Sequence, residues 1–391
     1  MENRTHMRSL HTLLLISGIL GRLPLQAQWE QVGLPGSIYG IAVQEGQVFA
    51  SQYNGGMHVS IDQGATWSGS GTGITNSSSW WIESVDGTLY NGTQFGPTFR
   101  SADDGANWVD IGKSGARGFI NHDDTLYTCQ WYDAAVSWSV DQGTTWHPTA
   151  TLVSSSPLWP MISHNGYLFV GAQGTGVRRI AHSDDTWSTM NSGLTSLVVY
   201  AFASIGDYLL LGGSAGVFRS MDDGQSWQPM GQTPLGQVYA LHTVGSLVFV
   251  GLDGGGVQFS ADSGATWAPI NTGLTNMVVA RLTNDDNYLY AGTLGGGVHR
   301  LLLNDITTGL EEAPGVTTVS VFPVPANDRV QVDWPGHRTV GYVLHDMTGS
   351  TVQRGTVDAG GIAVDALAPG LYLLQLQAAD GAVRTTRVVR E

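Results

Sequence analysis

The sequence predicts an all-β protein with two parts, a seven-bladed β-propeller followed by a small C-terminal β-sandwich. Three observations lead to this prediction. The 391 residues include 53 glycines and only 13% charged residues, a composition that suits turn-rich β-structure better than helical bundles. One short phrase containing Asp, Gly and Trp recurs along residues 60–267 at a spacing near 40 residues. From about residue 317 this pattern gives way to a second series of short strands.

The repeated phrase is Ser-x-Asp-x-Gly-x-x-Trp, complete at 60–67, 101–108, 139–146, 220–227 and 260–267. Its Asp can fold back onto backbone N–H groups, its Gly supplies the positive φ of a tight turn, and its Trp begins the next strand and buries a large ring. The phrase resembles the Asp-box, or BNR, repeat, which implies a hairpin between the two outer strands of a propeller blade. Because the aspartates recur once per blade, we expect them to be structural: Asp62, Asp103, Asp141, Asp222 and Asp262.

The spacing of the repeats gives the number of blades. Their tryptophans lie at 67, 108, 146, 187, 227 and 267, so the steps are 41, 38, 41, 40 and 40 residues. A period near 40 with several short strands per unit is typical of a propeller blade. Seven units carry a large apolar residue at one place in their second strand: Phe49, Tyr90, Tyr127, Phe169, Leu210, Phe249 and Tyr290.

Blades four and seven depart from the repeat. In blade four His182 stands where the others have Asp, and we interpret it as a degenerate turn rather than a metal ligand because no second ligand is near in sequence. In blade seven no such turn follows residues 297–300, whereas Gln28–Val32 resembles the strand that begins at Trp267. We expect this N-terminal strand to complete blade seven and close the ring, which removes free sheet edges.

Residues 1–27 have the features of a secretory signal peptide. Arg4 and Arg8 precede a short apolar run, and Ala27 offers a cleavage site before the mature chain. No later segment is apolar enough to span a membrane as a helix.

Two further features complete the outline. Cys129, the only cysteine, falls inside an expected strand, and we interpret it as a small buried side chain rather than a catalytic thiol. Residues 304–316 are rich in Gly, Thr, Pro and acidic residues, which predicts a linker between a propeller at 28–303 and a second domain at 317–391.

Four motifs mark the second domain: Pro-x-Pro at 323–325, Asp-x-x-Gly at 346–349, Leu-x-x-Gly-x-Tyr at 367–372 and a basic last strand at 387–390. Together they resemble the C-terminal sorting domain of the Bacteroidetes type IX secretion system. The resemblance implies export through the periplasm and outer membrane, contact with the secretion machinery, and often attachment to the cell surface.

Charge and composition restrict the function of the propeller. A net charge of −15 argues against a nucleic-acid partner, which would need a basic face, and no cofactor or metal motif is present. Aromatic residues dominate the starts of the innermost strands, at the expected mouth of the central channel: Tyr39, Trp80, Arg117, Trp159, Tyr200, Tyr239 and Ala280. Aromatic rings there can stack on sugars or pack between blades, and the sequence leaves both roles open.

Residues that break the blade pattern are better functional candidates than residues that every blade shares. The departures cluster in blades two to four, and Tyr53 and Phe95 lie in matching loops of blades one and two. We expect a recognition surface for a glycan or protein ligand on one face, whose candidate residues are Trp80, Trp81, Arg117, Trp131, Tyr132, Asp133 and Trp159. The alternative is that these aromatics fill space beneath longer loops.

An enzymatic alternative is a glycoside hydrolase, because sialidases and other glycosidases carry Asp-boxes. Glu83, alone or paired with Asp133, is the candidate catalytic carboxylate. Sialidases need three arginines and an Arg-Ile-Pro motif, whereas this chain has two inner-strand arginines, Arg117 and Arg281, and no such motif. Photosystem-assembly propellers, which share the repeat, bind without catalysis. We therefore predict a secreted or surface-attached monomer that binds rather than catalyses, with hydrolysis as the alternative.

Overall fold

The computed structural model describes residues 28–132, 134–149, 156–181, 184, 186–230 and 236–308, and from the C-terminal part 320–322, 326–334, 340–346, 350–358, 360–378 and 383–390. The expected signal peptide, Asp133, His182 and most of the expected linker lie outside these residues.

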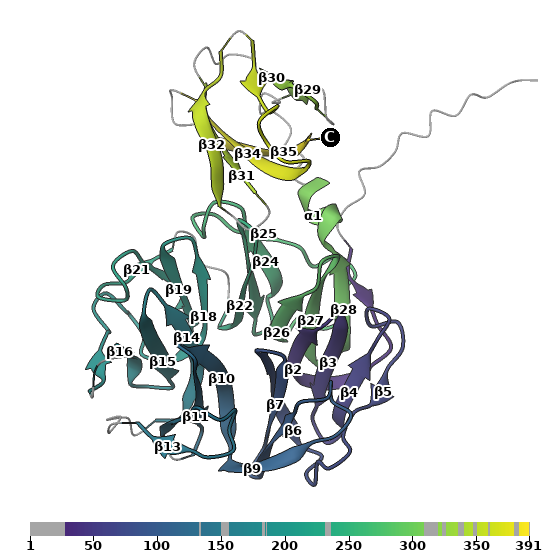
Figure 1. Cartoon of the computed structure of the whole chain (residues 1–391), viewed down its shortest axis with the longest axis vertical. Coiled ribbons are helices and arrows are strands. Elements are labelled where there is room, and N and C mark those ends of the chain that lie inside the picture. The colour runs from purple at the N-terminus through teal and green to yellow at the C-terminus, as the bar shows by residue number, and fades with distance from the viewer. Residues whose placement is uncertain are drawn as a thin grey trace, which may run out of the picture.

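Seven blades of four antiparallel strands are arranged around a centre, and the first strand of each blade lies innermost (Figure 1). Five blades form separate sheets, whereas the first and last blades join into one eight-stranded sheet. Blade one contains β2 (Gly36–Gln44), β3 (Gln47–Gln52), β4 (Gly56–Ser60) and β5 (Ser68–Gly69), and blade two contains β6 (Ser79–Val85), β7 (Thr88–Thr93), β8 (Pro97–Ser101) and β9 (Val109–Ser114). Blade three contains β10 (Ala116–His122), β11 (Thr125–Gln130), β12 (Val136–Ser139) and β13 (His147–Pro148). Blade four contains β14 (Leu158–His164), β15 (Tyr167–Ala172), β16 (Gly176–Ala181) and β17 (Ser188–Thr189).

Blades five to seven continue the same order of strands. Blade five contains β18 (Val199–Ile205), β19 (Tyr208–Gly213), β20 (Gly216–Ser220) and β21 (Gln228–Pro229), and blade six contains β22 (Val238–Val244), β23 (Leu247–Leu252), β24 (Gly256–Ser260) and β25 (Ala268–Pro269). Blade seven contains β26 (Val279–Asn284), β27 (Tyr288–Gly295) and β28 (Gly297–Leu302), together with β1 (Glu30–Gln31) from the N-terminus. The predicted seven-bladed propeller is confirmed.

The N-terminal strand closes the ring as expected. β1 pairs with β28, where Glu30 lies opposite Arg300, and the two side chains form an ion pair at 2.9 Å. Trp29 is 2% exposed and donates its indole N–H to the carbonyl of Ile270 in blade six. Trp108 and Trp227 likewise donate to carbonyls of the preceding blade, so Trp29 occupies the place of a repeat tryptophan.

The five complete repeats fold into one type of turn. In the first, the Ser60 hydroxyl accepts the N–H of Gly64 at 2.7 Å, and Asp62 Oδ1 accepts the N–H of Thr66 at 2.8 Å; the other four repeat both bonds. Gly64 has the expected positive φ of 91°, but Gln63 before it also has a φ of 60°. The hydrogen bonds within the turn lower the pKa of Asp62 to about 2.

Each innermost strand carries a β-bulge near its start, where its register against the second strand shifts. The residues inside these shifts are Tyr39, Trp80, Arg117, Trp159 with Pro160, Tyr200, Tyr239 and Ala280. A bulge re-aims a side chain, so one residue per blade is turned out of the regular pleat. Because successive strands run in opposite directions, the bulges and the loops between second and third strands share one face, and the repeat turns lie on the other.

Two other expectations concern single elements. Cys129 is fully buried, as predicted, and burial raises the pKa of its thiol. The start of the expected linker is instead a short helix, α1 (Leu303–Thr308), whose Ile306 packs into the core shared by blades six and seven.

The C-terminal part is a sandwich of two antiparallel sheets, which lies beside α1 at the edge of the ring (Figure 1). One sheet contains β29 (Ser320–Phe322), β30 (Arg329–Asp333) and β33 (Ile362–Ala363); the other contains β31 (Val340–His345), β32 (Thr351–Thr356), β34 (Gly370–Ala378) and β35 (Val383–Arg390). Val330, Leu344, Leu374 and Val388 form its buried core. The predicted β-sandwich is confirmed.

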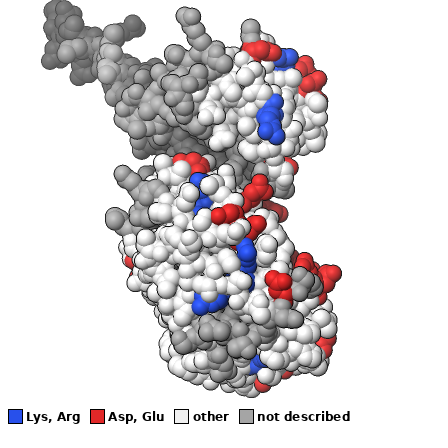
Figure 2. All heavy atoms as spheres, turned by 90° about the vertical axis from the view of Figure 1, so that its left-hand side faces the viewer, with Lys and Arg blue, Asp and Glu red and all other residues white. Residues whose placement is uncertain are grey.

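Figure 2 shows that uncharged residues make up most of the described surface on one side of the molecule, in keeping with the low content of charged residues. Across the described part of the chain, no helix is both long enough and apolar enough to cross a membrane.

Candidate functional site

The bulges bring six large side chains together at the mouth of the central channel. These residues, which we call the mouth arc, are Tyr39, Trp80, Arg117, Trp159, Tyr200 and Tyr239. Tyr39 stacks on Trp80 with ring centroids 4.9 Å apart, and Tyr200 meets Trp159 and Tyr239 edge-on at 6.0 and 5.2 Å. Blade seven contributes only Ala280 at the equivalent position, so the arc is open there.

Arg117 links the aromatic rings of the arc. Its guanidinium carbon lies 3.7 Å from the centroid of Trp80, 4.8 Å from that of Trp131 and 5.6 Å from that of Trp159. The residue is 1% exposed, and among the described residues its Nε and Nη2 atoms have no hydrogen-bond partner. Burial lowers the pKa of Arg117 to about 10, so it remains a cation at neutral pH.

Three further aromatic residues, the loop aromatics, are exposed beside the arc. Tyr53, Phe95 and Tyr132 occupy equivalent loops of blades one, two and three and are 40%, 75% and 47% exposed. Tyr53 lies 5.7 Å from Tyr39, and Phe95 stacks on Tyr132 at 5.3 Å. Phe95 has a φ of 54°, a left-handed conformation that a bulky residue adopts only where the surrounding structure imposes it.

The structure brings most of the sequence-predicted site residues into this region. Trp131 meets Trp159 at 5.1 Å, so both contribute to the cluster around Arg117. Trp81 is 7% exposed and lies deeper, lining the channel 6.2 Å from Trp159. Asp133 lies outside the described residues.

Arg281 is a site residue that the sequence analysis did not select. Its guanidinium carbon lies 3.9 Å from the Trp81 centroid and 5.4 Å from that of Trp159. The sequence does contain a sign of its role, because five other blades have small or compact residues at the equivalent position: Gly40, Gly118, Pro160, Ala201 and Ala240. Only Trp81 and Arg281 break that pattern, and they contact each other.

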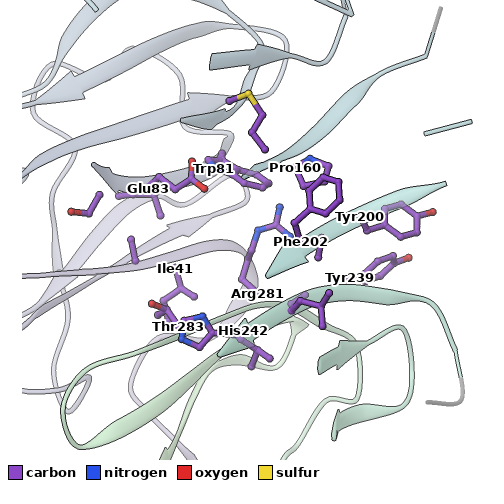
Figure 3. Close-up of a pocket in the computed structure, with 18 of the residues that line it drawn as sticks. Ile41, Trp81, Glu83, Pro160, Tyr200, Phe202, Tyr239, His242, Arg281 and Thr283 are labelled. Atoms are coloured by element: carbon purple, nitrogen blue, oxygen red, sulfur yellow. The ribbon is translucent and has the colours of Figure 1, made fainter. Parts of the chain in front are cut away.

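Beneath the arc lies a channel pocket of about 300 Å³ (Figure 3). Glu83 lines it and accepts the N–H of Phe119, yet its surroundings are so enclosed that burial raises the pKa of its carboxyl to about 7. Glu83 is the only carboxylate among the described lining residues, so the described lining does not supply the two-carboxylate arrangement of a glycosidase.

His242 also lines the pocket, where its Nε2 contacts Asn284 Oδ1 at 2.7 Å and burial lowers its pKa. The part of the chain that the structure describes contains no group of three or more His, Cys, Asp or Glu residues placed to hold a metal ion.

Residues 320–390 match the family model described as "Secretion system C-terminal sorting domain". The chain is therefore exported by the type IX secretion system and is secreted or held at the cell surface, and its C-terminal domain is the part that the secretion machinery recognises. Among curated proteins, none matches this chain in sequence.

Solved structures with a similar fold include YCF48 bound to a D1 peptide, at 13% identity and a TM-score of 0.59, covering 72% of this chain and 96% of that chain. Virginiamycin B lyase from Staphylococcus aureus is 13% identical with a TM-score of 0.60, over 71% of this chain and all of that one (100%). PorZ, an essential surface component of the type IX secretion system of Porphyromonas gingivalis, is 15% identical with a TM-score of 0.54. That match covers 91% of this chain but only 59% of PorZ. At these identities the likeness shows the propeller fold alone.

Proposed function

We propose that the protein is a binding protein of the cell exterior whose ligand, a glycan or a protein segment, is held on the mouth arc and the loop aromatics. In this proposal residues 28–303 form a monomeric propeller of the Asp-box class, residues 304–316 connect it to the sorting domain at 317–391, and residues 1–27 are removed on export. The propeller carries the function, and the C-terminal domain serves its delivery.

The observation that carries the proposal is the continuity between the exposed loop aromatics and the arc. Tyr53 contacts both Tyr39 and Trp80, so an exposed ring extends the surface of the arc outward from the channel. Phe95 and Tyr132 present a second stacked pair, mostly exposed, on the neighbouring blades. Exposed aromatic groups of this kind are unfavourable unless a partner covers them, and rigid aromatic rings are typical anchors of binding surfaces.

Arg117 supports the same proposal. Arg117 has no carboxylate partner among the described residues, and its contacts with three indoles offset only part of the cost of burying a cation. The arrangement holds Trp80, Trp131 and Trp159 in fixed positions around one planar group. A surface whose rings are held in advance loses less conformational freedom when it binds.

The test is a glycan array, together with direct binding measurements on any protein partner, that compares the native chain with a Trp131→Ala, Tyr132→Ala double variant. We expect the variant to fold and to lose its ligand. Trp138→Ala is the matched control, because Trp138 packs against His147, with ring centroids 4.5 Å apart, in the outer part of blade three. A double variant that melts at a lower temperature but retains every interaction would show that the aromatics only pack.

The hydrolase alternative rests on Glu83, whose pKa of about 7 suits a general acid. It would need a second carboxylate in the channel. Polysaccharide turnover that disappears in Glu83→Gln would replace the binding proposal with this alternative.

A further inference from the structure

The channel pocket differs in chemistry from the aromatic surface above it. Its wall combines apolar side chains such as Ile41, Phe202 and Leu282 with a few polar groups that converge from different blades. A cavity of about 300 Å³, lined by apolar and aromatic side chains and by polar groups that converge on one place, can hold and orient a small molecule.

Arg281 is the central polar group of this pocket. Figure 3 shows its side chain reaching into the middle of the pocket below Trp81. Its Nη1 donates to the carbonyl of Ala280 at 2.6 Å, whereas its buried Nε has no hydrogen-bond partner among the described residues. No described carboxylate forms an ion pair with it within 4 Å, since the pairs found involve other arginines and histidines.

The pocket is positive although the protein as a whole is acidic. Burial lowers the pKa of Arg281 to about 9, and nearby Arg117 lowers it further, whereas Glu83 opposes both effects. Both arginines remain charged at neutral pH. Against these two cations stands Glu83, which is only partly ionised near pH 7, and burial lowers the pKa of His242, which favours its neutral form. A positive site with low-dielectric walls attracts anions.

We propose that the channel pocket binds a small carboxylate that has an aromatic or other ring as its body, and that Arg281 holds the carboxylate. A guanidinium presents N–H donors in a plane that matches a carboxylate, which explains why an arginine rather than a lysine would be used. The ring of the ligand packs against Trp81, Phe202 and Tyr200, which line the same pocket. The ligand enters through the arc, which is open at Ala280. This inference goes beyond the proposed surface and does not depend on it.

The test uses sodium benzoate as the probe and benzamide as its neutral analogue, titrated into the full chain and followed by saturation-transfer NMR. We expect saturable binding of benzoate and at least about tenfold weaker binding of benzamide. A factor of this size corresponds to the free energy of one hydrogen bond to a charged group. Arg281→Gln should weaken benzoate binding by a similar factor. Benzamide binding equal to that of benzoate, or unchanged benzoate binding in Arg281→Gln, would overturn the proposal.

Two controls make the result specific. Arg219→Gln removes an arginine that lies 4.8 Å from the Tyr208 ring and is not part of the pocket wall, and it should leave benzoate binding unchanged. The Trp131→Ala, Tyr132→Ala double variant should also bind benzoate normally, so failure of the surface proposal and failure of this one are distinguishable.

If Arg281→Gln does not fold, the pH dependence in Glu83→Gln supplies the test. The charged and titratable groups around Glu83 are Arg281 and Arg117, which stay charged, the Cys129 thiol, whose raised pKa keeps it neutral, and His242, whose lowered pKa favours the neutral form. Benzoate affinity of the native chain should fall several-fold as the pH rises from 6 to 8 and Glu83 ionises, roughly in line with a buried charge pair. The affinity of Glu83→Gln should not change over this range. The same fall in both proteins, or none in the native one, would contradict the proposal.

Discussion

The guanidinium carbon of Arg117 lies 3.7 Å from the centroid of the Trp80 ring, although the two residues belong to neighbouring blades. A stack of this kind, desolvated and without a counter-ion among the described residues, contributes about 2 kcal/mol or somewhat more, whereas burying a charge costs several kcal/mol. The position is therefore a poor choice for stability alone. It makes sense if the cation and the rings it fixes act on a ligand.

The first prediction separates these roles of Arg117. We expect the free energy of unfolding of Arg117→Met to equal that of the native chain or to exceed it by up to about 1 kcal/mol, because an apolar side chain of similar length avoids the buried charge. Arg117→Lys should lose about 1–2 kcal/mol, because an ammonium is more strongly hydrated and cannot stack as a plane. Denaturant titration measures both changes. A larger loss in Arg117→Met than in Arg117→Lys would show that the cation is structural.

The second prediction concerns the repeat turns. Asp222 accepts the N–H and the hydroxyl of Ser226 and the hydroxyl of Ser220. We expect Asp222→Ala to lower the free energy of unfolding by about 1 kcal/mol, because these donors lose their partner in a turn that water can reach. Ligand binding at the opposite face should be unaffected. Asp286→Ala, at an exposed position, serves as the control, and loss of binding by a folded Asp222→Ala variant would give the turns a direct role.

The third prediction tests closure of the ring. Removal of residues 28–34 deletes β1 and leaves the edge of β28 without its partner, so we expect aggregation measured by light scattering. Trp29→Ala keeps the strand but removes the buried ring, and should lower the free energy of unfolding by about 3–5 kcal/mol. A deletion variant that remains monomeric and melts normally would contradict the role of this strand.

The fourth prediction follows from the raised pKa of Glu83. Because the pKa in the folded chain is about 7 and the ordinary value is 4.5, ionisation opposes folding. The penalty is absent below pH 4.5, grows between pH 4.5 and 7, and is fully present above pH 7. We expect Glu83→Gln to match the native chain at pH 4 and to be more stable by about 1–3 kcal/mol at pH 8, as measured by thermal denaturation. A gain at pH 4 equal to that at pH 8 would be inconsistent with a buried titrating carboxyl.

The fifth prediction concerns export. Removal of residues 317–391 should leave folded propeller in the periplasm, because the sorting domain is the part recognised for passage through the outer membrane. Cell fractionation measures the outcome. Efficient secretion of the shortened chain would show that the propeller carries its own export signal.

Comparison of the blades with one another predicted the features that recur. The repeat turns, the seven positions of the mouth and the closing strand around Trp29 could all be placed because each has several equivalents in the same chain. The helix α1 could not, because it occurs once and its single buried anchor, Ile306, has no counterpart in the other blades. The positive φ of Gln63 was missed for another reason, since no residue type at that position signals it: Gln, Asp and Ser all occur there.

The candidate site was predicted less completely than the fold. Trp80 and Trp81 are neighbours in sequence and were treated alike, but the bulge separates them: Trp80 joins the mouth arc and Trp81 lines the pocket. The role of Arg281 could likewise not be predicted from the sequence. Its departure from the small residues of the other blades was visible, but its contact with Trp81 depends on closure of the ring, which brings blades two and seven to one channel.

The bulges have a consequence for how this protein can diversify. Each one turns a single side chain toward the mouth while the strands on either side keep their register, so the blade core does not depend on which residue occupies the position. The present chain already tolerates tyrosine, tryptophan, arginine and alanine there. If the mouth binds the proposed ligand, point substitutions would change its specificity one blade at a time, without a change in the number of blades or in the turns on the far side. On the proposed function, two such rings with the same blades and turns would differ in ligand through these seven positions alone.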